Sequence, residues 1–220
     1  DDKLDIKANN RLILQFIVIS LALIIDFNLY IENLQIGFLN KNIALFNGSY
    51  LFTIFCITAL VNASNLVDGK DGLMGIIFLF FLLVFLFIQT GPFNLIIINL
   101  IISTILFLYY NIRGKLYLGN SGSYLLGGIM SFITIQSYNY ANFQIELIFF
   151  IFYLFGIDML RVYCERIVRG ISPFTPENNH LHHYVFDKFE NKYLALIVYI
   201  SLAICPFLIS IIYENYIFIL

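Results

Sequence analysis

The chain has 220 residues, of which 60% are hydrophobic and only 12% are charged, and its formal net charge is -2. Its mean hydropathy is +0.87. A soluble domain of this size cannot bury that much apolar surface, so the composition excludes a soluble protein and indicates an integral membrane protein. The sequence has no basic stripe with interleaved aromatic residues in a long loop, so no nucleic acid is expected as a partner.

Apolar runs of about 17 to 25 residues, the length that crosses a bilayer as a helix, recur along the chain. Seven runs are predicted to span the membrane: residues 12–30, 45–62, 73–90, 93–111, 122–138, 143–162 and 194–213. The last residues, YIFIL, are expected to begin an eighth span. The runs lack the apolar-polar alternation of barrel strands. The predicted fold class is therefore an all-α polytopic transmembrane helix bundle, with residues 1–220 forming a single integral membrane domain.

The start of the chain carries neither an initiator Met nor a signal-peptide pattern. We therefore expect the chain to be incomplete at its N-terminus. Asp26, Glu146 and Asp158 are expected near the ends of their spans, which leaves the membrane interior nearly free of charge and disfavours a transporter.

Basic residues are distributed unequally between the loops. The loops 1–11, 63–72, 112–121 and 161–193 hold all of the Lys and Arg residues except Lys41. By the positive-inside rule these loops are predicted to be cytoplasmic, with 31–44, 91–92, 138–142 and 213–215 outside. The cytoplasmic loops also hold most of the acidic motifs and all three histidines, which topology alone does not require.

Two acidic clusters lie in the predicted cytoplasmic loops. DDKLD contains Asp1 and Asp2 ahead of the first span, and these carboxylates are either solvated or cation-binding. In NASNLVDGKDGL, residues 62–73, the spacing of Asp68 and Asp71 sets both carboxylates on one face, while glycines let the backbone approach a ligand. Carboxylates at a membrane edge indicate a functional site.

Two further polar segments follow. LYLGNSGSYLLGG, residues 116–128, places small polar residues directly before a helix, which suits either phosphate binding or simple capping by Ser121 or Ser123. RVYCERIVRGISPFTPENNHLHHYV holds two arginines and three clustered histidines. Zinc is not expected because no further ligands complete a four-ligand set. The three cysteines lie far apart and predict neither a disulfide framework nor a Cys-rich metal site.

Together, acids, a glycine-rich turn and a basic histidine segment on one face of a bundle indicate a site for a phosphorylated substrate and a divalent cation. A polar ligand reaches such a site from the cytoplasm, and a lipid reaches it from between the helices. The pattern favours a membrane phosphotransferase.

In order and spacing, the motifs DD, NASNLVDGKDGL, LGNSGSYLLGG and RGISPFTPENNHLHH resemble those of the polyprenyl-phosphate N-acetylhexosamine-1-phosphate transferase family, over the whole chain. The HLHH form is similar to the undecaprenyl-phosphate N-acetylglucosaminyl branch and less similar to the muramoyl-pentapeptide branch. The resemblance implies transfer of a sugar 1-phosphate from a UDP-sugar to undecaprenyl phosphate, with release of UMP. It also implies Mg2+, with Mn2+ as an alternative, a bacterial plasma membrane location with the site on the cytoplasmic face, and leaves a homodimer open.

The resemblance also implies roles for individual residues. Asp1, Asp2, Asp68 and Asp71 are the expected catalytic residues, the first two acting on the lipid phosphate. The expected Mg2+ ligands are Asn65, Asp68, Asp71 and Asn120. The expected substrate-binding residues are Asn62, Asn65, Lys70, Arg166, Arg169, His180, His182 and His183. Lys70 and the two arginines are included because their charge suits a diphosphate.

The sequence departs from the family pattern in three places. Asn120 stands where the family usually has Asp, and an amide brings no charge to a hard cation. The family's Pro ahead of Asp158 is missing, and PENNH replaces a more usual acid and base before the histidines. A non-catalytic relative that binds at the membrane therefore stays open as the alternative, with a transporter behind it.

Overall fold

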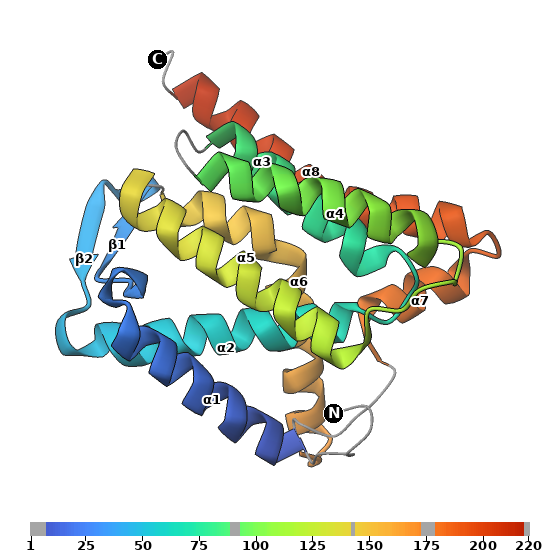
Figure 1. Ribbon diagram of the computed structural model, residues 1–220, viewed down its shortest axis with the longest axis horizontal. Coiled ribbons are helices and arrows are strands. Elements are labelled where there is room, and N and C mark those ends of the chain that lie inside the picture. The colour runs from blue at the N-terminus through green and yellow to red at the C-terminus, as the bar shows by residue number, and fades with distance from the viewer. Residues whose placement is uncertain (1–7, 89–92, 142–143, 173–178, 218–220) are drawn as a thin grey trace. The chain divides into compact units, whose positions relative to one another are not determined.

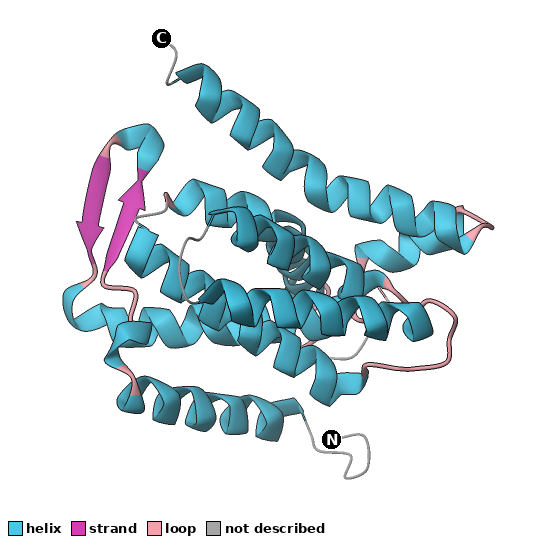
Figure 2. Ribbon diagram, turned by 45° about the horizontal axis from the view of Figure 1, so that its top comes forward, coloured by secondary structure: helices cyan, strands magenta, loops and turns pink. Residues whose placement is uncertain are grey.

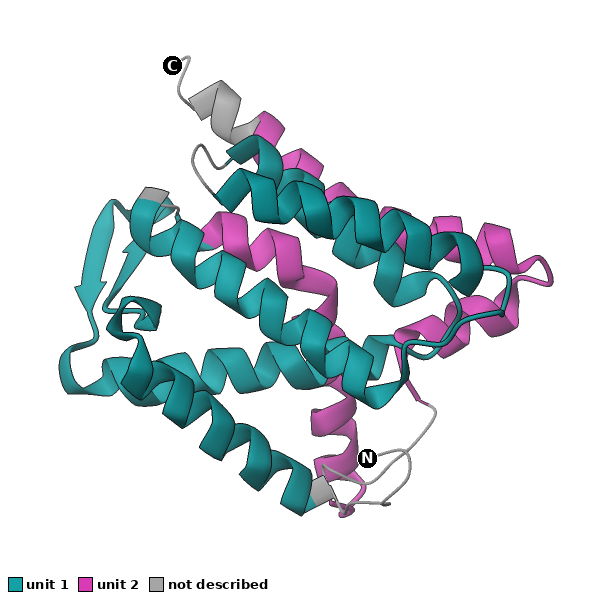
Figure 3. Cartoon of the chain, in the orientation of Figure 1, with its two compact units in different colours: residues 1–145 teal, residues 146–220 magenta. Residues whose placement is uncertain are grey.

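The structure, a computed structural model, describes residues 8–88, 93–141, 144–172 and 179–217. It is predominantly helical, which confirms the predicted fold class (Figure 1). The helices are α1 Ala8–Ile25, α2 Ser49–Val67, α3 Leu73–Ile88, α4 Phe93–Asn111, α5 Gly119–Ala141, α6 Ile145–Val168, α7 Leu181–Lys188 and α8 Lys192–Ile217. The chain divides into two compact units, Asp1–Ile145 and Glu146–Leu220 (Figure 3).

Each of the seven predicted apolar runs overlaps a helix. Among the described residues, four helices are long and apolar enough to cross a membrane: Phe46–Val67, Phe93–Asn111, Ile145–Val168 and Lys192–Ile212. Asn9–Ile25 and Leu73–Ile88 are apolar but shorter. The number of spans therefore stays a prediction, while the helical character of the runs is confirmed.

The outer faces of several helices are apolar. On α1, Val18 and Ile24 are 62% and 57% exposed, and on α4, Leu95 and Leu106 are 70% and 62% exposed. Contiguous apolar surface of this kind is unfavourable in water and favourable against lipid. The exposed side chains therefore agree with a membrane environment.

Several helix ends differ from the sequence prediction, and three of them change its meaning. Helix α1 stops at Ile25, because Asp26 accepts a hydrogen bond from the backbone N–H of Asn28 and starts a 3-10 turn. Helix α6 continues to Val168, six residues beyond the predicted span end at 162, so Asp158 lies in the helix interior and not near its end. Helix α8 runs through 213–215, where a loop and a following eighth span were expected.

The extra length of α6 has a local cause. Arg161 and Glu165 form an (i, i+4) ion pair on its surface, and Glu165 forms another with Arg169. Such pairs support a helix beyond its apolar stretch. The prediction followed hydrophobicity alone and ended the helix too early.

A β-hairpin was not predicted within residues 31–44. Strand β1, Asn33–Ile36, pairs antiparallel with β2, Lys41–Ala44, in the register Asn33 to Ala44 and Ile36 to Lys41 (Figure 2). Asn40 closes the turn with a left-handed backbone at φ 48, a conformation that Asn tolerates better than most residues.

The hairpin is held by the end of α5. The hydroxyl of Tyr138 donates to the Asn33 carbonyl at 2.7 Å and accepts from the Gln35 N–H at 2.8 Å. The neighbouring Asn139 amide donates to the carbonyls of Asn28 and Tyr30. These contacts fix one end of the first unit, opposite to the turn between α2 and α3 (Figure 1).

Helices α2 and α5 pack closely along the first unit. A Cβ on Gly127 would lie 2.8 Å from the Cα of Val61 and 2.9 Å from the hydroxyl oxygen of Ser64, so only glycine permits this approach. Farther along α5, the hydroxyls of Ser131 and Thr134 donate hydrogen bonds to backbone carbonyls of the same helix. Small residues at helix contacts and internally bonded hydroxyls are typical of membrane helix packing.

Candidate functional site

The turn between α2 and α3 carries the acidic pair predicted from the sequence. Asp68 follows the last residue of α2, and Asp71 lies two residues before α3 begins. The Gly69 N–H donates to the Val67 carbonyl at 2.7 Å. Gly72 has φ 86, a left-handed conformation that favours glycine. The turn thus folds back tightly and holds both carboxylates between two apolar helices.

Asn111, the last residue of α4, fixes this turn from a distant part of the chain. Its side-chain oxygen accepts from the Gly72 N–H at 2.7 Å, and its amide group donates to the Leu116 carbonyl at 2.7 Å. Asn111 is 6% exposed. Asn111 was not among the predicted site residues; its only signal in the sequence is a polar residue at the end of an apolar run. It joins the acidic turn to the segment that leads into α5.

Asn65 and the glycine-rich segment also meet. The Ser123 hydroxyl lies 2.7 Å from the Asn65 side-chain oxygen and donates to it, and it also approaches the Asn120 carbonyl at 3.0 Å. Helix α5 begins at Gly119, three residues before the predicted start at 122. Ser121 and Ser123 therefore lie inside the helix, and the capping role considered for them is wrong. The helix starts early because Gly119, at φ 68, turns the chain into it.

The electrostatics of the acidic turn are unusual. Burial, with a further contribution from the neighbouring Asp71 carboxylate, raises the pKa of Asp68 from 3.8 to about 7. Asp71 is exposed, and its Oδ2 lies 3.6 Å from where a Cβ on Gly114 would stand. Two carboxylates in one turn, one of them partly desolvated, repel each other and favour a bound proton or cation.

The same end of the first unit holds Arg11, which was not predicted as a site residue, together with the predicted Lys70 and Asn62. Arg11, early in α1, donates to the Tyr124 hydroxyl at 3.5 Å, so the beginnings of α1 and α5 lie together. Lys70 is partly buried within the acidic turn. The amide of Asn62 donates to Gln15 at 2.8 Å and to the Thr58 carbonyl, which directs it toward α1.

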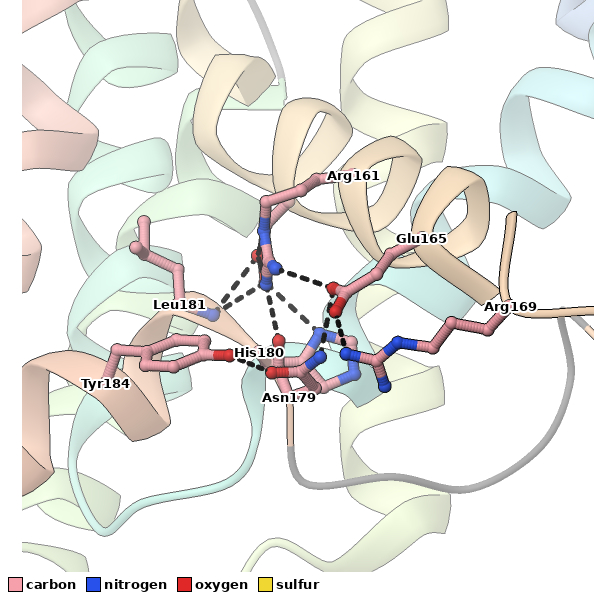
Figure 4. Close-up of polar contacts among 8 residues, drawn as sticks. Arg161, Glu165, Arg169, Asn179, His180, Leu181 and Tyr184 are labelled. Atoms are coloured by element: carbon pink, nitrogen blue, oxygen red, sulfur yellow. Dashed lines mark hydrogen bonds and ion pairs between the residues drawn. The ribbon is translucent and has the colours of Figure 1, made fainter. Parts of the chain in front are cut away.

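In the second unit, the buried carboxylate of Asp158 on α6 lies beside the histidine segment. Figure 4 shows the labelled residues that surround it. Asp158 Oδ2 is 3.1 Å from His180 Nδ1, and its Oδ1 accepts from Arg161 at 2.8 Å. The Leu181 N–H donates to both carboxylate oxygens, at 3.1 and 3.2 Å. The start of α7 is therefore bound to the interior of α6 by one side chain.

An outer layer of contacts continues the network. Glu165 pairs with Arg161 and with Arg169, and it accepts from the Asn179 amide at 2.9 Å. Arg161 also donates to the Asn179 carbonyl, and Tyr184 donates to the Asn179 side chain. Arg169, predicted to bind substrate, thus pairs with Glu165 in this structure (Figure 4).

The three histidines differ in their surroundings. His180 and His182 are 5% and 1% exposed, and their rings are parallel within 3° at a centroid distance of 5.8 Å. His183 is partly buried, with its ring 4.1 Å from that of His182. Arg166 is 4% exposed within α6. The second unit therefore gathers the predicted histidines and arginines at one end of α6.

The structure brings the predicted residues together within each unit. Asn65, Asp68, Asp71 and Asn120 lie at one end of the first unit, and the histidines lie around Asp158 in the second. That these two groups meet at one substrate stays a prediction. Asp1 and Asp2 lie outside the described residues. Sequence reasoning missed Asn111 and the contacts of Asp158, which hold predicted residues in place.

The donor set of the acidic turn suits a hard cation. In the described ranges, no three His, Cys, Asp or Glu side chains group as metal ligands. Mg2+, however, commonly takes one or two carboxylates and completes its shell with water and substrate phosphates. Asp68 and Asp71, with amide oxygens nearby, fit that requirement. Burial, with a smaller contribution from Asp71, raises the pKa of Asp68, so its charged form is favoured only if a cation balances it.

These features define an integral membrane protein with an acidic, glycine-rich site at the basic end of its first helical unit. The family model of glycosyl transferase family 4 matches residues 1–138. The chain belongs to this family.

Curated relatives agree with that assignment. The undecaprenyl-phosphate alpha-N-acetylglucosaminyl 1-phosphate transferase of Yersinia pestis is 29% identical over 196 residues, covering 84% of this chain and 53% of the relative. The Salmonella typhi protein of the same name is 26% identical over 216 residues, covering 93% and 59%. The phospho-N-acetylmuramoyl-pentapeptide-transferase of Fervidobacterium nodosum is 32% identical over 165 residues, covering 73% and 53%. The chain spans about half the length of the curated relatives it matches.

Proposed function

We propose that the protein transfers a sugar 1-phosphate, of the N-acetylhexosamine class, from a UDP-sugar to undecaprenyl phosphate and releases UMP. The reaction is the first membrane step of a cell-envelope polysaccharide pathway. It takes place at the cytoplasmic face of the bacterial plasma membrane. The names of the relatives support the lipid acceptor and the transferred group, and the positive-inside distribution of Lys and Arg supports the orientation.

The observation that carries this proposal is the acidic turn and its anchoring. Asp68 and Asp71 occupy a turn that Asn111 holds from α4, and Asn65 on the adjoining helix bonds to Ser123 on α5. Positioning and charge neutralisation are what phosphoryl transfer requires of a protein. A turn anchored at two points supplies the positioning, and its two carboxylates would hold a cation that neutralises the phosphate charge.

In the proposed reaction, an oxygen of the lipid phosphate attacks the β-phosphorus of the UDP-sugar. A new phosphorus–oxygen bond forms, the bond from the β-phosphorus to the bridging oxygen breaks, and UMP leaves with that electron pair. The lipid phosphate is already anionic near neutral pH, so its attack does not require a general base.

Each group of residues has a role in this proposal. Asn65, Asp68, Asp71 and Asn120 would hold Mg2+, which would neutralise diphosphate charge. Lys70 and the arginines of α6 add positive charge near the phosphates. The histidines meet the UDP-sugar, and Asp1 and Asp2 orient the lipid phosphate.

The direct test is UMP release by the full-length protein in detergent micelles with UDP-N-acetylglucosamine, undecaprenyl phosphate and Mg2+. We expect release that needs all three, and a loss of about 100-fold or more on Asp71→Asn. Asp187→Asn, an exposed acid on α7, is the matched control and should leave release unchanged. Release that persists without undecaprenyl phosphate, or undiminished in Asp71→Asn, contradicts the proposal.

One observation favours a second candidate. Asn120 stands in the first turn of α5, where the resembling family has an acid, and an amide is a weaker partner for Mg2+. A non-catalytic relative would bind undecaprenyl phosphate without releasing UMP from a UDP-sugar. Lipid binding without UMP release, measured on the same preparation, separates this candidate from the enzyme.

A further inference from the structure

Asp158 is an acidic side chain in the interior of an apolar helix, where an acidic residue is uncommon. It is 5% exposed and lies among the residues of α6. An ionised group in such a place is unfavourable unless it is paired and fully hydrogen-bonded. Asp158 meets that condition through three donors, and two of them belong to the histidine segment.

The first of these two donors is the backbone of α7. His180 precedes the helix and makes no side-chain cap, so the helix begins without a local acceptor. Asp158 takes that place, because both of its oxygens accept from the Leu181 N–H. A carboxylate at a helix N-terminus is favoured by the exposed N–H groups and the helix dipole. The position of α7 on α6 therefore depends on Asp158.

The second donor is the ring of His180. A carboxylate accepts hydrogen bonds, so the contact of 3.1 Å places the proton of His180 on Nδ1. Nε2 is then the ring atom left to meet a ligand. The His182 ring lies parallel to it, with 5.8 Å between the ring centroids.

Arg161 completes the arrangement from the other side. It balances the Asp158 charge at 2.8 Å, and it also donates to the Asn179 carbonyl just ahead of His180. Glu165 lies farther out, is 30% exposed in its side chain, and does not share the contact with the ring. Asp158, and not Glu165, therefore sets the orientation of the His180 ring.

We propose that Asp158 is a positioning residue: it caps α7 and holds His180 with its proton on Nδ1, so that Nε2 faces the phosphates of the UDP-sugar. The last clause rests on the proposed function, in which the histidines meet the sugar donor. The capping and the tautomer stand on the geometry alone. Asp158 acts through His180 and does not itself touch the substrate.

The decisive variant is Asp158→Asn in the full-length protein. An amide of the same size offers one acceptor oxygen and an NH2 group, which cannot accept from Nδ1–H. The NH2 group instead favours His180 with Nδ1 as the acceptor and the proton on Nε2. The matched control is Asp187→Asn, the same chemical change at an exposed position of α7.

The first measurement is NMR of the protein with 15N-labelled histidine in micelles, with the His180 signals identified by their loss in His180→Gln. We expect a protonated Nδ1 on His180 in the native protein and in Asp187→Asn. In Asp158→Asn we expect the proton to move to Nε2. A His180 signal that is the same in Asp158→Asn and in the native protein overturns the proposal.

The second measurement is the kinetics of UMP release. We expect Asp158→Asn to raise the KM for the UDP-sugar and lower kcat, each by about tenfold or more, with the KM for undecaprenyl phosphate unchanged. A variant that is only less stable loses active protein and leaves both KM values unchanged, and that result counts against the positioning role. If the native protein releases no UMP, the proposed function fails, while the NMR result still decides the role of Asp158.

Discussion

The side-chain oxygen of Asn111 accepts a hydrogen bond of 2.7 Å from the backbone N–H of Gly72, 39 residues earlier in the chain. The bond joins the C-terminal residue of α4 to the acidic turn that precedes α3. Position 111 requires a side chain that both accepts and donates hydrogen bonds, because the Asn111 NH2 group also donates to the Leu116 carbonyl. The acidic turn therefore depends on a residue with no charge of its own.

We predict that Asn111→Ala destabilises the protein by about 1–3 kcal/mol, because the buried Gly72 N–H and the partly buried Leu116 carbonyl lose their partner. Asn111→Asp keeps the acceptor but loses the donor, and it adds a third carboxylate beside the turn, so it should reduce UMP release further than its stability loss explains. Thermal unfolding in micelles and UMP release measure the two effects. Asn99→Ala, an exposed Asn on the same helix whose amide bonds only within it, is the control.

The raised pKa of Asp68 gives a second prediction, on pH and stability. Its folded-state pKa of about 7 lies above its ordinary value of 3.8. The folded protein therefore holds the proton more tightly than the unfolded chain, and the stabilisation is full below pH 3.8 and is lost as the pH rises through 7. With chelator present, the unfolding temperature should rise when the pH is lowered from 8 to 6.

Two variants check the origin of this dependence. Asp68→Asn should remove most of it, because the amide has no proton to gain. Asp71→Asn should weaken it and shift it to lower pH, because the neighbouring carboxylate raises the pKa of Asp68. An unfolding temperature with the same pH dependence in Asp68→Asn and in the native protein would assign the dependence to another group.

The sequence predicted those parts of the fold that follow from local composition. The apolar runs at 73–90 and 93–111 became α3 and α4 with nearly the predicted bounds, since hydrophobic length decides a membrane helix. The acidic pair was recognised because its spacing and its glycines are visible in one short segment. Within the first unit, Asn65 and the glycine-rich segment were expected at the same face, and Ser123 joins them.

Features that depend on distant partners could not be read from the sequence. The hairpin requires Tyr138, about a hundred residues later, to bind its backbone. The role of Asn111 cannot be recognised from the sequence, since a single Asn at the end of a helix is common. Asp158 was predicted near a span end because hydrophobicity falls there, whereas ion pairs on the helix surface extend α6 beyond it.

The contact of α5 with α2 yields a third prediction. Gly127→Ala should destabilise the protein by about 1–3 kcal/mol, because the added methyl group would meet the Val61 backbone at 2.8 Å. Gly128→Ala, the neighbouring residue on the same helix, has no atom within 4 Å of its added Cβ. That control should be neutral or stabilising by about 1 kcal/mol through helix propensity. Equal effects of the two substitutions would rule out the close packing of α2 and α5.

A fourth prediction concerns membrane topology. Ser172 and Asn42 are both exposed, at the basic end of the second unit and on the hairpin of the first. In a background without Cys56, Cys164 and Cys205, a cysteine at 42 should react with an impermeant thiol reagent added to intact cells. A cysteine at 172 should react only after the cells are opened. If both positions were labelled from outside, the histidine segment would lie outside the cell, where it could not meet a UDP-sugar from the cytoplasm.

The last prediction concerns Asn120, where the chain departs from its family pattern. Mg2+ binds few protein ligands, and exchanging a carboxylate for an amide removes a full negative charge from around it. If the metal lies at the start of α5, Asn120→Asp in the full-length protein should lower the Mg2+ concentration needed for half-maximal UMP release. Turnover should rise by roughly tenfold for each 1.4 kcal/mol recovered.

A charge placed one residue away tests whether position matters for this effect. Ser121→Asp adds the same carboxylate to the same helix start, on an exposed side chain, and should change the Mg2+ requirement little. If both variants lower the requirement equally, the gain is a general attraction of cations and Asn120 is no ligand. If the native protein needs only ordinary Mg2+ and Asn120→Asp does no better, the amide is an adapted ligand, since its carbonyl oxygen already serves.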